Sequence, residues 1–360
     1  MKNFKAAVLT HLNKPLTIVS GVECYKPMRG QVLVKLAFSG VCHSQLMEVR
    51  GRRGPDAYLP HLLGHEGSGE VVEIGDGVSK VSPGDLVVLG WIKGRGLECG
   101  GVQYHCNCLP EKINAGGVTT FNEYALVSEN RVVPLPAGVP LDIAVLFGCA
   151  VPTGAGIITN DLQPVAGSSI AVFGLGGIGM SALMATMLFK CAKVIAVDVS
   201  PDKLALARSF GATHTIDVSA NDPIDEIRTL TGGVGVDYAV EASGQVKVIE
   251  QAFASIRRNG GVCVFATHPE QGNTISIDPY ELICGKQIRG TWGGSSNPDR
   301  DIPMFAQLYM EGKLPLEKLI TKRYPLDAIN EALDDLENHR VGRPLIEIDA
   351  TIGLTNTTTE

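Results

Sequence analysis

In the first part of the chain, short apolar segments alternate with turns. These segments are separated by glycine and proline and lie at 6–9, 31–37, 69–74, 85–89 and 124–127. Short apolar runs at this spacing are typical of strands joined by loops. We therefore predict a β-rich domain with many loops up to about residue 150.

After Thr153 the pattern changes, and segments of strand length alternate with segments of helical length. Apolar segments typical of buried strands lie at 170–173, 194–197, 213–216, 238–241, 262–266 and 288–292. Segments with a helical pattern lie at 203–210, 224–230 and 246–255. This alternation predicts an α/β fold with a doubly wound sheet of parallel strands over about residues 154–293.

A glycine-rich turn follows the first of these buried strands. Residues 169–180 read Ser-Ile-Ala-Val-Phe-Gly-Leu-Gly-Gly-Ile-Gly-Met and contain the Gly-x-Gly-x-x-Gly spacing of a dinucleotide-binding turn. Gly174 permits the tight turn, Gly176 leaves room for a pyrophosphate, and Gly179 lets the next helix pack closely. We expect that helix to begin at Gly177 and to offer free N–H groups to the anion.

The next predicted strand ends in an acidic residue, Asp198. It follows the last glycine of the turn at about the 20-residue spacing expected for a ribose-binding carboxylate. A carboxylate accepts hydrogen bonds from a ribose 2′-OH and repels a 2′-phosphate, so NAD is favoured over NADP. The alternative is a strand–helix–strand unit whose glycines serve packing only.

Composition and charge narrow the class of protein. The 360 residues suffice for about two domains, and a net charge of −7 without a basic stripe argues against binding to nucleic acid. The N-terminal residues do not have the apolar core of a signal peptide, and no apolar run of about 18 residues predicts a membrane span. A cytoplasmic location is the expectation. Nine cysteines, an odd number, argue against a disulfide framework.

Three motifs in the first part of the chain contain residues able to bind a metal. They read Gly-Val-Cys-His-Ser at 40–44, Gly-His-Glu-x-x-Gly at 64–69 and Phe-Gly-Cys-Ala-Val-Pro-Thr-Gly at 147–154. In these motifs and their order, the chain resembles the zinc-dependent alcohol dehydrogenases of the medium-chain dehydrogenase/reductase superfamily. The resemblance extends over about residues 5–349.

The resemblance implies two domains. A GroES-like, β-rich catalytic domain would comprise residues 1–153 and 294–360, and a Rossmann NAD-binding domain would comprise residues 154–293. It also implies a homodimer or homotetramer that assembles through edge strands of the Rossmann sheets.

The resemblance further implies that Cys42, His65 and Cys149 bind a catalytic zinc ion, which leaves one position for an alcohol oxygen. Glu66 would be the acidic neighbour that tunes the metal, although it could instead be an ordinary buried ion-pair partner. Ser44 would accept the proton of the alcohol while hydride passes to nicotinamide. Taken singly, each of these residues is more often structural.

Two residues depart from the family pattern. Gln45 stands where an aspartate often orients the ligating histidine, which puts the support of His65 in doubt, although an amide oxygen could accept the same hydrogen bond. Met47 stands where a histidine often passes the proton to solvent. The outward relay from Ser44 would then use the cofactor ribose and water.

Four further residues match cofactor contacts of the family. His43 and Arg343 would contact the pyrophosphate, Lys203 would lie near the adenosine ribose, and Thr153 would pack against nicotinamide. Each of them could instead be surface charge or core.

A loop with three arginines matches the family's substrate entrance. Arg50, Arg52 and Arg53 could form a solvated surface, as charged loops usually do, or could recognise an anionic alcohol through guanidinium contacts. Met47 and Trp91 fall at positions that line the family's pocket, and Trp91 could equally belong to the core.

The segment 93–117 is shorter than in relatives that bind a second zinc ion on four cysteines. Cys99, Cys106 and Cys108 lie in it with a C-x₆-C-x-C spacing, which is awkward for a tetrahedral structural site. His105 or Glu98 could supply a fourth donor. We do not expect a second, structural zinc ion here.

The resulting prediction is a zinc- and NAD-dependent enzyme that interconverts a small alcohol with an aldehyde or ketone. One alternative is a polyol or sugar dehydrogenase of the same superfamily, with an anionic or nucleotide-linked substrate among the options. Another is a dinucleotide-sensing protein without turnover, and the presence of all three zinc ligands argues against it.

Overall fold

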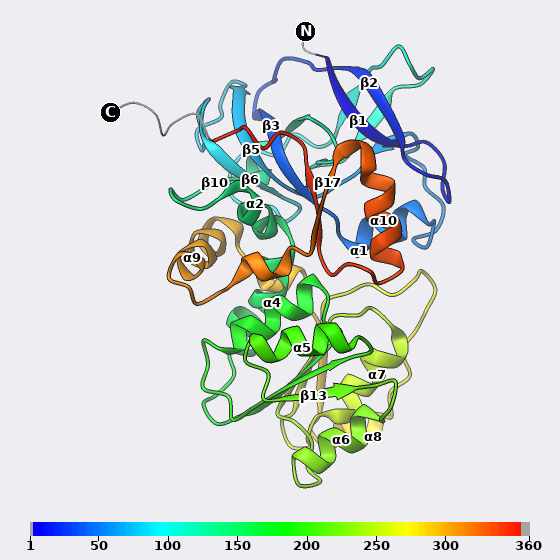
Figure 1. Ribbon diagram of the computed structural model, residues 1–360, viewed down its shortest axis with the longest axis vertical. Helices are drawn as coiled ribbons and strands as arrows, with labels where there is room; N and C mark the ends of the chain where they lie inside the picture. The colour runs from blue at the N-terminus through cyan, green and yellow to red at the C-terminus, as the bar shows by residue number, and fades with distance from the viewer. Residues whose placement is uncertain (1–2, 354–360) are drawn as a thin grey trace. The chain divides into compact units, whose positions relative to one another are not determined.

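The computed structural model describes residues 3–353 (Figure 1), and contacts within the chain divide it into two compact units. One unit holds the chain up to Cys149, Asn297–Met310 and the residues from Leu316 onward, and the other holds Ala150–Ser296 with Glu311–Pro315. The domain limits given above remain a prediction, and residues 354–360 lie outside the described part of the chain.

The first unit contains two sheets. One has five strands in the order β2 (Thr17–Glu23), β1 (Asn3–Leu9), β4 (His61–Leu62), β8 (Ile113–Ala115) and β7 (Val102–Tyr104). The other has seven strands, with the path β10 (Val132–Pro134), β6 (Leu86–Gly90), β5 (Glu66–Ile74), β3 (Gln31–Gly40), β18 (Pro344–Glu347) and β17 (Lys322–Pro325), while β9 (Tyr124–Ser128) also pairs with β3.

Strand β3 is central to the second sheet, and nine of its ten residues are buried. Because β18 pairs antiparallel with β3, with Ile346 opposite Ser39, the C-terminal segment closes the same unit that the N-terminal segment begins. The prediction of a β-rich domain with many loops is confirmed.

Short helices complete this unit: α1 (His43–Val49), α2 (Leu141–Ala144), η2 (Val145–Gly148), α9 (Pro298–Met310) and α10 (Ile329–Glu337). Helices α1 and α10 lie next to each other (Figure 1). Leu46 and Val49 of α1 pack with Ile329 and Leu333 of α10 in one buried cluster. This contact fixes the helix that follows Cys42.

The second unit is built on a parallel sheet of six strands. Their order is β13 (His214–Asp217), β12 (Lys193–Asp198), β11 (Ser169–Phe173), β14 (Tyr238–Glu241), β15 (Val262–Phe265) and β16 (Gln287–Gly290). This is the doubly wound order: from β11 the strands are added first toward one edge of the sheet and then, from β14, toward the other. Ligands of such sheets bind at the carboxyl ends of the strands where the order switches, here between β11 and β14. The predicted Rossmann-type sheet is confirmed.

Helices flank this sheet (Figure 1): α3 (Ala150–Gly156), α4 (Gly177–Thr186), α5 (Pro201–Ser209), α6 (Pro223–Leu230), α7 (Val246–Ser255) and α8 (Pro279–Ile283), with a π-helix at Ile157–Leu162. Phe173, Ile195, Val197, Ala239 and Cys263 of the sheet form a buried cluster with Ile227 of α6 and Phe253 of α7. Helix α4 begins at Gly177, as predicted.

Among residues 3–353, no single helix is long and apolar enough to cross a membrane. A bent pair, Leu141–Gly148 with Ala150–Leu162, reaches the necessary length and apolar composition only when its two parts are counted together.

Candidate active site

Cys42, His65 and Cys149 lie on three loops of the first unit. Cys42 follows β3 and directly precedes α1, His65 directly precedes β5, and Cys149 follows η2. The antiparallel pairing of Ser39 with Gly67 brings the first two loops to the same end of the sheet. Sheet register therefore places two of the three residues, and the loop after η2 adds the third.

Two glycines allow the close approach of these loops. A Cβ atom on Gly40 would lie 2.6 Å from the carboxylate of Glu66, and one on Gly148 would lie 2.4 Å from the carbonyl oxygen of Leu89. A larger residue at either position would displace the loops that hold Cys42 and Cys149.

The three side chains converge. One donor atom of each lies within 4.8 Å of the other two, and both cysteines are buried. Nε2 of His65 is buried and has no hydrogen-bond partner among the described residues. A buried nitrogen without a partner is unfavourable unless it binds a ligand. Two thiols and one imidazole are donors that suit zinc, so these residues fit the zinc ion that the sequence predicts.

The two cysteines do not titrate alike. The pKa of Cys42 lies well below its usual value because Cys149 donates a hydrogen bond to it, and His65 and Arg343 add to this effect. The same hydrogen bond raises the pKa of Cys149. Cys42 is therefore the first to become a thiolate, and binding of a metal would release the remaining proton from Cys149.

Gln45 supports His65. Its side chain is 3% exposed, its Oε1 accepts a hydrogen bond from the N–H of Cys42 at 3.2 Å, and its Nε2 contacts Nδ1 of His65. A histidine that binds a metal through Nε2 carries its proton on Nδ1 and needs an acceptor there. The N–H of Cys42 and Nδ1–H of His65 then compete for a single amide oxygen.

Glu66 and Arg343 form a buried ion pair beside the cysteines. Glu66 is 0% exposed, and its Oε1 accepts a hydrogen bond from Nη2 of Arg343. Burial raises the pKa of Glu66, and the positive charge of Arg343 opposes this rise. Arg343 thus lies close to the predicted zinc ligands. Its expected contact with the cofactor pyrophosphate remains a prediction.

Three more predicted site residues belong to α1. His43 is its exposed first residue, Ser44 places its Oγ 3.5 Å from Nδ1 of His65, and Met47 is buried. Trp91 directly follows β6 and is half-buried, and its carbonyl oxygen accepts a hydrogen bond from Arg131. Of these four residues, Ser44 has a hydrogen-bond contact with a predicted zinc ligand.

The arginines of the entrance loop differ in their partners. Arg50 pairs with Asp334 and Glu337 of α10, each at 2.7 Å, and Arg52 pairs with Glu337 at 3.0 Å. Arg53 is exposed and forms no ion pair with any residue in 3–353. Two of the three positive charges are therefore compensated within the unit.

In the second unit, the geometry gives a reason for each glycine of the predicted dinucleotide-binding turn. Gly174 has a φ of +83°, which favours glycine. A Cβ atom on Gly179 would lie 1.8 Å from the carbonyl oxygen of Gly174, whereas one on Gly176 would meet nothing within 4 Å. The turn is tight where helix meets strand and open where a pyrophosphate is expected, at the start of α4.

Asp198 ends β12 and is linked to this turn. Its Oδ2 accepts a hydrogen bond from the N–H of Leu175 at 2.6 Å, and its Oδ1 accepts one from the N–H of Ser200 at 2.9 Å. The carboxylate is thus held beside the glycine turn, where a ribose hydroxyl is expected. Binding of that hydroxyl remains a prediction.

The two other cofactor contacts expected in the second unit lie in helices. Thr153 belongs to α3 and is buried, and its Oγ1 has no hydrogen-bond partner among the described residues. Lys203 lies in the first turn of α5 and is half-buried. A hydroxyl that lacks a partner is available to a ligand.

The sequence analysis missed Glu241. This buried residue ends β14, next to β11, and its Oε1 accepts hydrogen bonds from the N–H groups of Ser243 at 2.6 Å and Gly244 at 2.9 Å. Burial raises its pKa. The available signal was an acidic residue at the end of an apolar strand, the same signal that identified Asp198.

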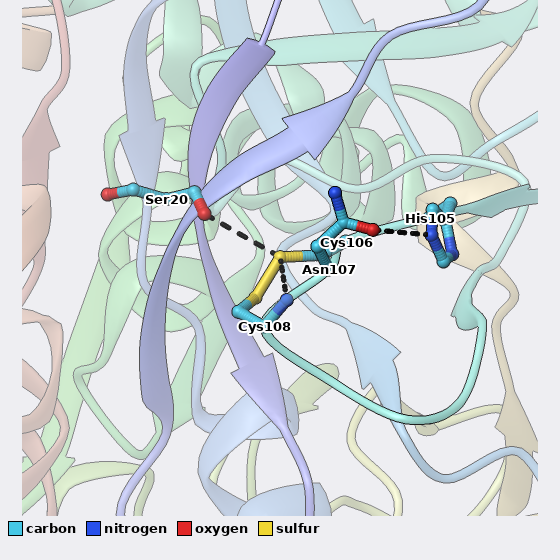
Figure 2. The surroundings of a disulfide bond; sticks show 5 residues. All are labelled: Ser20, His105, Cys106, Asn107 and Cys108. Atoms are coloured by element: carbon cyan, nitrogen blue, oxygen red, sulfur yellow. Dashed lines mark hydrogen bonds between the residues drawn. A yellow bond between two sulfur atoms is a disulfide. The ribbon is translucent and has the colours of Figure 1, made fainter.

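The cysteines of segment 93–117 do not form a common site. Cys106 and Cys108 are joined by a disulfide bond, with Cys106 buried beside the carbonyl oxygen of Ser20 (Figure 2). The sequence analysis argued against a disulfide framework and did not predict this one bond, because a count of cysteines says nothing about which side chains meet. Cys99 instead contacts the carbonyl oxygen of Arg29 at 3.1 Å.

The two residues considered as further donors in this segment have other partners. His105 contacts Asn107 through Nε2 at 3.1 Å (Figure 2), and Glu98 pairs with Lys93 at 2.8 Å. The hydrogen bond from Lys93 lowers the pKa of Glu98 to about 2.

Two family models match the chain. The alcohol dehydrogenase GroES-like domain matches residues 28–137, and the zinc-binding dehydrogenase domain matches residues 177–309. A similar protein is the S-(hydroxymethyl)glutathione dehydrogenase of Photobacterium damsela subsp. piscicida, 33% identical over 95% of this chain and 99% of that protein.

Solved structures agree with these matches. A zinc-binding-domain alcohol dehydrogenase from Burkholderia ambifaria has a TM-score of 0.88 and 33% identity, over 96% of this chain and 99% of that chain. Benzyl alcohol dehydrogenase from Acinetobacter calcoaceticus has a TM-score of 0.87 and 30% identity, over 97% of this chain and 100% of that chain.

Proposed function

The chain belongs to the zinc-dependent alcohol dehydrogenases of the medium-chain dehydrogenase/reductase superfamily, and we propose that its substrates within this family are uncharged primary alcohols. It is an NAD-dependent oxidoreductase that interconverts an alcohol with an aldehyde or ketone. The observation that carries the assignment of the site is the convergence of Cys42, His65 and Cys149 around the partnerless Nε2 of His65.

The residues of the first unit have separate roles in this proposal. Cys42, His65 and Cys149 hold the zinc ion, which supplies a Lewis acid for the alcohol oxygen. Ser44, whose Oγ lies 3.5 Å from Nδ1 of His65, would accept the hydroxyl proton of the alcohol and pass its own proton outward through the cofactor ribose and water. Gln45 orients His65.

The cofactor is held by the second unit in this proposal. The N–H groups at the start of α4 bind the pyrophosphate over the open side of Gly176, and Asp198 accepts hydrogen bonds from the adenosine ribose. Thr153 offers its partnerless hydroxyl to the nicotinamide end. His43, Lys203 and Arg343 remain predicted contacts of the phosphates and the adenosine ribose.

Charge in the entrance loop supports an uncharged substrate. Arg50 and Arg52 are compensated by Asp334 and Glu337, so an anionic alcohol would compete with carboxylates that are already in place. Met47 and Trp91 would give the pocket an apolar lining. The benzyl alcohol dehydrogenase among the related structures acts on a substrate of this class.

The rival substrate is an anionic alcohol. S-(hydroxymethyl)glutathione carries carboxylates and is the substrate named for several relatives. Arg53, which has no ion-pair partner among the described residues, is the cation that would recognise it. A polyol or sugar substrate is the remaining alternative within the superfamily.

The test is NAD reduction by the zinc-loaded protein with benzyl alcohol, an aliphatic alcohol, a polyol and S-(hydroxymethyl)glutathione. We expect kcat/KM to be at least about tenfold higher for benzyl alcohol than for S-(hydroxymethyl)glutathione, with no change in this ratio in Arg53→Ala. A preference for the anionic substrate that disappears in Arg53→Ala would establish the rival instead.

The site itself is tested separately. Cys149→Ser should lose turnover and the zinc ion held by Cys42, His65 and Cys149 while remaining folded, and Cys284→Ser is the matched control that should retain both. If the wild type binds NAD but neither zinc nor any alcohol, the chain is a dinucleotide sensor rather than an enzyme.

We also propose that the chain forms a homodimer or homotetramer in the cytoplasm. The edge strand β16 lies near exposed apolar side chains, Ile283 at 80% and Trp292 at 79% exposure, which favours pairing of two such edges. Seven free cysteines favour a reducing compartment. Light scattering on the wild type and on Ile283→Lys tests the assembly, and cell fractionation tests the location.

A further inference from the structure

A second group of possible metal donors lies at the other end of α1. Glu48 belongs to the last turn of α1, Asp56 to the loop that follows, and His61 to β4, and one donor atom of each lies within 4.8 Å of the other two. None of these residues is among the predicted ligands of the catalytic zinc ion. The group therefore needs its own explanation.

His61 is oriented as a ligand would be. It is buried, with 7% of its surface exposed, and its Nδ1 lies 2.9 Å from the carbonyl oxygen of Leu62. A carbonyl oxygen only accepts hydrogen bonds, so Nδ1 must carry the proton. In the neutral ring the lone pair of Nε2 then points at Oδ2 of Asp56, 2.8 Å away. A lone pair that faces a carboxylate is unfavourable, so Nε2 must bind either a proton or a metal ion that Asp56 shares.

Glu48 adds a second carboxylate without a partner. Its side chain is half-buried and forms no hydrogen bond or ion pair with any other residue in 3–353. Like charges this close repel each other in partly buried surroundings, and no arginine or lysine of the described chain pairs with either carboxylate. The other oxygen of Asp56, Oδ1, accepts the N–H of Tyr58 at 2.8 Å, which fixes the orientation of that carboxylate.

We propose that Glu48, Asp56 and His61 bind a second divalent transition-metal ion, with Zn²⁺ as the best match. One imidazole and two carboxylates suit zinc better than calcium or magnesium, which prefer oxygen donors alone. Donors of one tetrahedral zinc ion lie about 3.4 Å apart at bond lengths of about 2.1 Å. Nε2 of His61 and Oδ2 of Asp56, now 2.8 Å apart, would therefore separate by about 0.6 Å when the ion binds, and Glu48 would rotate toward them. Water would supply the remaining ligand.

Such an ion would connect three elements of the first unit. It would join the end of α1, the arginine-bearing loop at 50–60 and β4, in addition to the ion pairs of that loop with α10. Since α1 begins at Cys42, the ion would also stabilise the helix that carries the catalytic residues at its other end. The expected consequence is an ordered entrance loop.

The first measurement is metal stoichiometry on the full chain after removal of metals. We expect wild type to bind two equivalents of Zn²⁺ and Glu48→Gln to bind one, with the affinity of the lost site reduced about 10- to 100-fold. Glu73→Gln is the matched control, because Glu73 is an exposed carboxylate on β5, and it should retain both equivalents.

Cobalt distinguishes the two sites. Co²⁺ at Cys42 and Cys149 should give thiolate-to-metal charge-transfer absorption that is unchanged in Glu48→Gln and absent in Cys149→Ser. The second equivalent should give no such absorption, should persist in Cys149→Ser, and should slow amide hydrogen exchange in residues 50–60 of the wild type but not of Glu48→Gln.

Three results would overturn the proposal. They are a single equivalent in wild type, two equivalents in Glu48→Gln, and loss of both sites in Cys149→Ser. The first would mean that His61 is an imidazolium paired with Asp56. If circular dichroism shows that Glu48→Gln does not fold, Asp56→Asn replaces it, with the same expected loss of one equivalent.

Discussion

Replacing Gln45 by glutamate should tighten zinc binding at Cys42, His65 and Cys149. Gln45 has one acceptor oxygen, which already accepts the N–H of Cys42 at 3.2 Å, and its amide nitrogen contacts Nδ1 of His65. When Nε2 of His65 binds the metal, Nδ1 becomes a second donor. Glutamate has the same length and offers two acceptors, one for each of these donors.

The magnitude follows from the contacts. A buried donor left without an acceptor costs about 1 to 3 kcal/mol, and a hydrogen bond to a charged acceptor contributes about 1.5 to 3 kcal/mol. Burial of the new carboxylate at a position only 3% exposed offsets part of this gain. A net gain of about 1.4 kcal/mol corresponds to a Kd for zinc about tenfold lower.

The assay is competition for zinc with a chromophoric chelator at fixed pH. We expect Gln45→Glu to lower the Kd about tenfold, and Gln45→Met, which keeps the volume but removes both acceptor and donor, to raise it about 10- to 100-fold. An unchanged or higher Kd in a folded Gln45→Glu protein would show that Gln45 does not support His65 through Nδ1.

Three further predictions concern the second unit. Gly179→Ala should lower the free energy of unfolding by about 1 to 3 kcal/mol, since its Cβ would meet the carbonyl oxygen of Gly174, whereas Gly176→Ala should leave stability unchanged and weaken NAD binding. Urea titrations measure the stability of both variants, and NADH fluorescence measures their cofactor binding. Equal effects of the two substitutions would contradict the geometry. Asp198→Asn should raise the Kd for NAD about tenfold and reduce the preference over NADP; an unchanged preference would remove Asp198 from the ribose site. Arg258 and Lys286 lower the pKa of Glu281 to about 2 in the folded protein, below its value of about 4.3 in an unfolded chain. The ionised side chain should therefore stabilise the fold fully above about pH 4.3 and lose this effect toward pH 2. In urea titrations, the free energies of unfolding of wild type and Glu281→Gln should converge as the pH falls.

The sequence predicted the features that depend on local pattern. Strand and helix periodicity gave the six-stranded parallel sheet, and the spacing of Gly174, Gly176 and Gly179 gave the turn after β11. Gly174 is required by its positive φ and Gly179 by the close approach of the Gly174 carbonyl, whereas Gly176 leaves open space. The three motifs and their order, through the resemblance to a known family, predicted that Cys42, His65 and Cys149 converge. Each of these signals lies within a few residues of the feature that it predicts.

Contacts between distant parts of the chain could not be predicted in this way. Glu337 compensates Arg50 and Arg52 from 287 and 285 residues away, so the sequence left their role open. The disulfide of Cys106 and Cys108 joins residues only two positions apart, but whether their side chains meet depends on the conformation of the loop that carries them. No pattern along the chain reports such geometry.

The same limit applies to the charge of the active site. Arg343 reaches Glu66 across 277 residues, and both side chains are buried. With both cysteines deprotonated, two thiolates, one carboxylate and one guanidinium carry a total charge of minus two, which a single divalent cation neutralises. Without Arg343 the buried charge would be minus three, and one negative group would remain uncompensated in surroundings that penalise it strongly. Arg343 therefore makes the set of buried charges match a divalent ion, whatever further contact it makes with the cofactor.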